Sequence, residues 1–192
     1  MNDMDQDELA IAAGRGLRRR AENLLKEGAN PDARDRNGKT PLVFASMRGH
    51  NDVVQTLLRY GAKVNLGDRT GTPPLGWAAA KGRDDVAETL LKHGADVNLP
   101  GNKALTPLMV ASARGRVEIA GMLLRYGADM DLKDDDGNTA RDLAENGGHA
   151  SIVKMLDAAA VEEGPQHGPS VPTVKRKRAA RPKSKPREDC PR

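Results

Sequence analysis

The amino-acid sequence predicts an all-α protein: a helical repeat solenoid in which short helical hairpins stack in one row. Two observations predict this fold. An apolar pattern punctuated by glycine and proline recurs every 33 residues through the first 160 residues. The composition is 38% hydrophobic with one Phe, one Trp and two Tyr, so a core must consist mainly of Leu, Val, Ile and Ala. Such a core suits closely packed thin helices and disfavours a β-sandwich or barrel.

The most complete copy of the repeat spans residues 35–67, and copies at 68–100 and 101–133 follow it in phase. Partial copies flank these at about 2–34 and 134–160. A dozen in-phase matches are not a chance event. The positions that recur, given for the copy at 35–67, are Asp35, Gly38, Thr40, Pro41, Leu42, Ala45, Gly49, Val53, Leu57, Leu58, Gly61, Ala62 and Asn65.

Each unit has the local signals of two short antiparallel helices joined by a turn. Thr40 is a typical N-cap and Pro41 fits the first helical position, where its missing N–H would be unpaired anyway. Gly49 and Gly61 can take the left-handed conformation that ends a helix. The apolar residues of 53–58 fall on one helical stripe. One unit cannot bury that stripe alone, whereas stacked neighbours can.

The pattern D-x-x-G-x-T-P-L-x-x-A with a trailing L-L-x-x-G-A-x-x-N resembles the ankyrin repeat family. The resemblance covers residues 1–160 as five repeats, of which the first and last are similar to capping repeats. It implies helix-turn-helix units with short β-turn or hairpin fingers between them. It also implies a protein-protein interaction module, whose partner docks on the concave face formed by the turn tips and the first helices.

Some positions depart from the family pattern. In the third unit Gly101 and Ala104 stand where Asp and Gly would be, so we expect the turn at 99–106 to be rearranged or mobile. In the second unit Pro73 takes the place of the capping Thr. In the first unit Asp7 occupies that place, and we expect it to cap the first helix.

Residues 161–192 differ in composition from the rest of the chain. They carry a net charge of +5, against −1 for residues 1–160, and hold six of the twelve prolines. Their few apolar residues predict a disordered basic tail. One basic run in it resembles a monopartite nuclear-import signal. Non-specific contact with nucleic acid or anionic lipid, or a purely solubilising role, are the alternatives. The run consists of Lys175, Arg176, Lys177 and Arg178.

Signals of catalysis and of cofactor or metal binding are missing from the sequence. The four histidines are scattered without metal-ligand spacing, and no phosphate-binding glycine motif occurs. The single cysteine, Cys190, excludes an internal disulfide. No apolar run is long enough for a membrane span, and no signal peptide is evident. We therefore expect a non-enzymatic, intracellular, cytoplasmic monomer without cofactor, which enters the nucleus if the tail is an import signal.

The residues at the turn tips and at the ends of the first helices are the candidate partner-binding residues. Seven of those in the middle three units are basic, which favours a partner with an acidic segment. The alternative is that these are ordinary solvated residues. The predicted partner-binding residues are Arg36, Asn37, Lys39, Met47, Arg48, Arg69, Thr70, Thr72, Lys81, Asn102, Lys103 and Arg114.

The favoured hypothesis is thus an adaptor that binds a protein partner on its concave face. A second hypothesis is a nuclear regulatory protein, similar to ankyrin proteins that inhibit kinases or join transcription complexes. Nucleic acid, if it binds at all, is expected to bind only non-specifically, through the tail.

Overall fold

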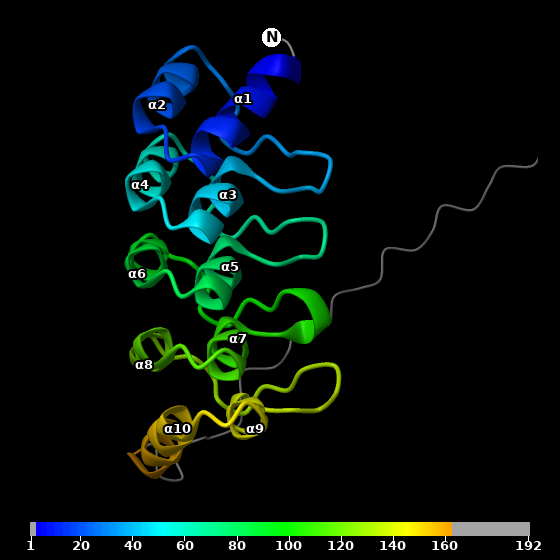
Figure 1. Ribbon diagram of the computed structural model, residues 1–192, viewed down its shortest axis with the longest axis vertical. Helices are drawn as coiled ribbons and strands as arrows, with labels where there is room; N and C mark the ends of the chain where they lie inside the picture. Colours follow the sequence, from blue (N-terminus) through cyan, green and yellow to red (C-terminus); the bar gives the residue numbers. More distant parts are fainter. Residues whose placement is uncertain (1–2, 163–192) are drawn as a thin grey trace, which may run out of the picture. The chain divides into compact units, whose positions relative to one another are not determined.

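The computed structural model describes residues 3–162, and within this range it contains ten α-helices, one short 3₁₀ turn and no strand. The helices form two rows (Figure 1). The row next to the projecting loops, which we call the inner row, contains α1, α3, α5, α7 and α9, and the outer row contains α2, α4, α6, α8 and α10. This arrangement confirms the predicted helical stack. The elements are α1 (Asp3–Gly14), α2 (Arg18–Lys26), α3 (Pro41–Arg48), α4 (Asn51–Arg59), α5 (Pro74–Lys81), α6 (Asp84–Lys92), η1 (Asn102–Ala104), α7 (Pro107–Ala113), α8 (Val117–Arg125), α9 (Ala140–Asn146) and α10 (Ala150–Glu162).

Threonine caps set the start of most inner helices. The hydroxyl oxygens of Thr40, Thr106 and Thr139 each accept a hydrogen bond from the backbone N–H three residues further on, at 3.2–3.3 Å. Pro73 makes no side-chain cap at the start of α5, as its sequence position predicts. The inner helix α3 then ends at Gly49, whose φ of 85° is in the left-handed region that a side chain disfavours.

The expectation that Asp7 caps the first helix is wrong. Helix α1 already begins at Asp3, so Asp7 lies inside it. The physical reason is the residue that follows each cap position. Helices α3, α5 and α7 begin at a proline, which disfavours helical backbone in the residue before it. In the first repeat Glu8 takes that place, so the helix extends toward the N-terminus.

The core lies between successive repeats. Each inner helix packs against the next inner helix, and each outer helix against the next outer helix. Four alanines at equivalent positions, with no exposed surface, allow the inner helices to approach closely. Leucines at a second set of equivalent positions are equally buried. The alanines are Ala45, Ala78, Ala111 and Ala144, and the leucines are Leu42, Leu75 and Leu108.

A ladder of polar side chains also connects the repeats. The Oδ1 atoms of Asp32, Asn65 and Asn98 each accept a hydrogen bond of 2.9 Å from a backbone N–H 31 residues further along the chain. These bonds bridge one repeat to the next across the loop that follows each outer helix. They give a structural reason for the recurrence of Asn or Asp at this position.

We call the turns at residues 35–39, 68–72, 101–105 and 134–138 the first to fourth fingers. The third finger differs from the others, as expected from its sequence. In the first finger the Asp35 carboxylate accepts hydrogen bonds from the N–H groups of Asn37 and Lys39, at 2.9 and 2.7 Å. Gly101 has no carboxylate to do this, and residues 102–104 form the 3₁₀ turn η1 instead. Lys103 and Ala104 take φ values of 56° and 55°, which are costly for residues other than glycine. The finger is therefore rearranged.

Replacing Ala104 with glycine should stabilise the protein. The substitution relieves the positive φ, and we expect the free energy of unfolding to rise by about 0.5–1 kcal/mol. Urea denaturation followed by circular dichroism measures this. Ala158, an exposed residue inside α10, is the matched control, and Ala158→Gly should lower the free energy of unfolding by about 0.5–1 kcal/mol. A loss of stability in Ala104→Gly would contradict this explanation of the turn.

Candidate functional site

The loops that lead from each outer helix to the next inner helix all project from the same side of the stack (Figure 1). We call the surface formed by their tips and by the exposed side of the inner helices the finger face. Because successive repeats are equivalent, residues that are 33 positions apart lie one above another on this face. Each sequence position thus forms a column along the stack.

Hydrogen bonds between neighbouring tips hold the fingers in place. The N–H of Arg69 donates to the carbonyl oxygen of Asn37 at 3.2 Å. The N–H of Asp135 donates to the carbonyl oxygen of Lys103 at 3.1 Å. Between the second and third fingers, the N–H of Asn102 donates to the Thr72 hydroxyl at 3.4 Å. The four tips therefore form a connected row.

All twelve predicted partner-binding residues lie at the fingertips or at the C-terminal ends of inner helices. Lys39, Met47 and Thr72 are half-buried, and the other nine are exposed. Six of the twelve surround one recess of about 420 Å³, together with Asp68 and Trp77. These six are Asn37, Lys39, Arg69, Thr70, Thr72 and Asn102.

Asp68 organises this recess. It is only 7% exposed. Its Oδ1 accepts hydrogen bonds from the N–H groups of Thr70 and Thr72, at 2.9 and 3.2 Å. Its Oδ2 accepts a bond of 3.0 Å from the indole Nε1–H of Trp77. One buried carboxylate thus fixes both the second fingertip and the half-buried tryptophan beside it.

Lys39 links two repeats through their aromatic side chains. Its Nζ lies 5.4 Å from the centroid of the Trp77 ring and 5.9 Å from that of Phe44, within the range of cation–π attraction. Phe44 lines a second recess of about 400 Å³, which Ile11, Arg15 and Arg48 also line. Lys39 therefore stands between the two recesses.

The sequence analysis missed the apolar side chains of this face. At one position of the 33-residue period every repeat holds an apolar residue, and we call this set the apolar column. Its first member is 52% exposed and the other four are half-buried. The signal was present in the repeat alignment, at the position two residues after the Leu of T-P-L. The apolar column consists of Ile11, Phe44, Trp77, Val110 and Leu143.

Basic side chains flank the apolar column on two sides. One helical turn beyond it, at or just after the ends of the first four inner helices, lie the exposed residues of the helix-end basic column, which are Arg15, Arg48, Lys81 and Arg114. The fingertips on the other side carry the tip basic residues, which are Arg36, Lys39, Arg69 and Lys103. Among residues 3–162, none of these eight forms an ion pair.

The last repeat has the opposite charge. Its fingertip exposes Asp135 and Asp136, and Gly147 takes the place of the helix-end basic residue. Burial would raise the pKa of Asp134 in the same tip, but hydrogen bonds from Asn138, Asp136 and Gly137 outweigh this and lower its pKa. The carboxylate is therefore charged at neutral pH. The finger face is basic over four repeats and acidic at its end.

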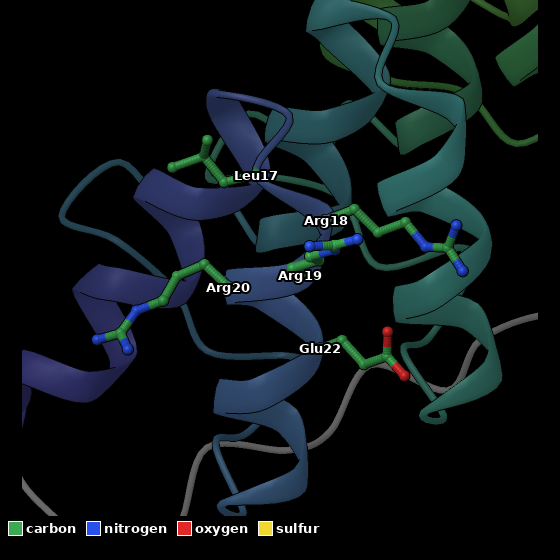
Figure 2. Close-up of a pocket in the computed structure, with 5 residues that line it drawn as sticks. All are labelled: Leu17, Arg18, Arg19, Arg20 and Glu22. Atoms are coloured by element: carbon green, nitrogen blue, oxygen red, sulfur yellow. The ribbon is translucent and has the colours of Figure 1, made fainter.

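A further recess, of about 740 Å³, lies at the start of α2 and is lined by Leu17, Arg18, Arg19, Arg20 and Glu22. Its charged side chains do not converge on one point, because Arg18 and Arg20 extend in opposite directions (Figure 2). Arg20 pairs with Glu8 of α1. Lys26 hydrogen-bonds Glu22 and lowers its pKa. These two pairings engage Arg20 and Glu22, two of the four charged residues that line the recess.

Within the part of the chain that the structure describes, no group of three His, Cys, Asp or Glu residues could hold a metal ion. No helix there is both long enough and apolar enough to span a membrane. The predicted import signal, Lys175 to Arg178, lies outside the described residues.

Comparison with known families assigns the repeats. A family model described as "Ankyrin repeats (3 copies)" matches residues 9–101, and one described as "Ankyrin repeats (many copies)" matches residues 90–144. Together they cover all three complete repeats and parts of both terminal ones. A search of curated proteins found no match.

Loss of the Asp68 carboxylate should be visible in the fluorescence of Trp77, the one tryptophan of the chain. In Asp68→Ala the indole loses its acceptor and three backbone or hydroxyl donors of the fingertip lose theirs. We expect a red-shifted emission and a free energy of unfolding lower by about 2 kcal/mol. Asp135→Ala, at an exposed tip, should change neither quantity. An unchanged emission in Asp68→Ala would contradict the role assigned to this carboxylate.

Proposed function

Because the chain belongs to the ankyrin repeat family, whose members are generally non-enzymatic protein-protein interaction modules, we propose that residues 1–160 act as a monomeric adaptor that binds a protein partner on the finger face. The twelve residues predicted from the sequence contribute to this surface. Ile11, Phe44 and Trp77 of the apolar column join them.

The observation that carries this proposal is the combination, on one face, of partly exposed apolar side chains and of basic side chains without an ion pair among the described residues. Phe44 and Trp77 are half-buried, so a partner can cover the rest of their surface and gain hydrophobic energy. The flanking basic residues make no ion pairs within residues 3–162, so a partner's carboxylates would not have to displace existing ones. Aromatic and Arg side chains are the types that dominate binding energy at protein interfaces.

The charges favour a partner with an acidic segment. Eight basic residues in two rows create a positive potential along the face, which speeds the encounter with an acidic partner and fixes its register. The acidic tip of the last repeat repels such a segment. The partner segment therefore lies over the first four repeats.

Charge reversal on the finger face tests this function. The full chain is used to capture its partner from a cell extract, and the partner is identified by mass spectrometry. The variant Arg36→Glu, Arg69→Glu, Lys103→Glu should then bind that partner with a Kd at least about tenfold higher, measured by calorimetry at low salt.

The matched control reverses three basic residues on the outer row of helices. Arg59, Lys92 and Arg125 are the exposed last residues of α4, α6 and α8, and these helices form the outer row, away from the loops that carry the fingertips (Figure 1). Their reversal to Glu makes the same change in net charge and should leave the Kd within about twofold. An equal loss of affinity in both variants, or in neither, would contradict binding on the finger face.

A nuclear regulatory role is the second candidate, and the basic run at residues 175–178 favours it. In this role the tail acts as an import signal and the repeats bind a kinase or a transcription complex. A chain that lacks residues 161–192 should then fail to accumulate in the nucleus of a eukaryotic cell while it still binds its partner. Unchanged nuclear accumulation would contradict the import role.

A further inference from the structure

We propose that the finger face recognises an acidic segment in the polyproline II conformation that carries an apolar residue at every third position. This proposal rests on the proposed function, since it specifies the partner segment for the same surface. Each triplet of the partner would occupy one repeat. Its apolar residue contacts the apolar column, and the next two residues are acidic.

The spacing along the apolar column sets the first requirement. Lys39 Nζ lies within 6 Å of both the Phe44 and the Trp77 ring centroids, so the two rings are at most about 11 Å apart. Packed helices generally lie about 8–10 Å from one another. A polyproline II helix has three residues per turn and rises about 9 Å per turn. Its every third side chain therefore matches one repeat of the column.

The flanking charges set the second requirement. In a three-residue turn, successive side chains point in directions about 120° apart. When one of them faces the apolar column, the other two point to its two sides. The helix-end basic column lies on one side, with Arg48 and Lys81, and the fingertips with Arg36 and Arg69 lie on the other. Carboxylates at both of the remaining positions of each triplet complement this pattern.

The position of Lys39 disfavours the other regular conformations. Its ammonium group lies within 6 Å of the centroids of both the Phe44 and the Trp77 rings, so a cation borders the column where these two rings follow one another. An amphipathic α-helix repeats its apolar side chains at three and four residues, about 5 Å apart along the axis, so every second one would lie between two members of the column and near this ammonium. A β-strand repeats its side chains about 7 Å apart on one face and loses register within two repeats.

Three synthetic peptides of equal composition test the proposal. Each has twelve residues, three Leu and nine Glu, and they differ only in whether the leucines are two, three or four residues apart. Binding is followed by the emission of Trp77, the one tryptophan of the chain, in the full-length protein. We expect a saturable change in emission, with a Kd for the three-residue spacing at least about tenfold lower than for the other two.

The peptide series separates this proposal from the proposed function. Equal Kd values for all three peptides would overturn the spacing rule and leave a general preference for acidic segments in place. Tighter binding of the four-residue spacing would overturn it in favour of a helical partner. If no peptide binds saturably, neither the spacing rule nor recognition of acidic segments on this face stands.

Variants of the protein test the same contacts by changing residues of the finger face instead of the peptide. Phe44→Ala removes one apolar contact and Arg48→Glu reverses one flanking charge, and each should raise the Kd of the three-residue peptide at least about fivefold. Arg48 is exposed, so its variant remains informative even if Phe44→Ala weakens the fold. Arg125→Glu on the outer helix α8 is the matched control and should leave the Kd unchanged. Unchanged binding in Arg48→Glu would overturn the proposal.

Discussion

Each helical hairpin of this chain has an apolar side that only a neighbouring hairpin can cover, and this contact between neighbours shapes everything else in the structure. Fully buried alanines such as Ala45 and Ala78 let the inner helices approach, and leucines such as Leu42 and Leu75 fill the space between repeats. The ladder of Asn and Asp side chains adds polar links across the same interfaces. Stacking thus converts a shift of 33 residues in sequence into a step of one repeat in space.

The side chains of the finger face form columns because residues 33 positions apart lie one repeat apart in space. Five apolar residues spread over 133 positions of sequence form one column, and basic residues at two other positions of the period flank it. No single repeat holds a site of its own. A cation–π contact between Lys39 and rings of two repeats, and the bond from Trp77 to Asp68, fix the central part of the face. A surface of this kind suits an elongated segment with a repeating pattern.

Much of the fold was predictable because its signals are local. The 33-residue period, the Thr caps, the glycine that ends α3 and the disturbed finger at Gly101 and Ala104 can each be recognised within one unit of sequence. The start of α1 was not predicted correctly, because alignment of Asp7 with the capping threonines ignored the proline that limits α3, α5 and α7. Seven of the eight basic residues of the candidate site were predicted from repeat positions, and Arg15 was not, because the prediction began with the second repeat. The apolar column was missed because one apolar residue in one unit does not show that five of them line up on a single face. That alignment depends on how the repeats stack, which no single unit specifies.

Side-chain contacts between repeats test this stacking most directly. In a methyl-labelled sample of the full chain, nuclear Overhauser effects should connect leucine methyl groups of adjacent outer helices, such as Leu57 with Leu90 and Leu90 with Leu123. None should join Leu24 in the first repeat to Leu156 in the last. Effects between these two distant leucines in the monomer would show that the chain folds back on itself, and would contradict a single row of hairpins.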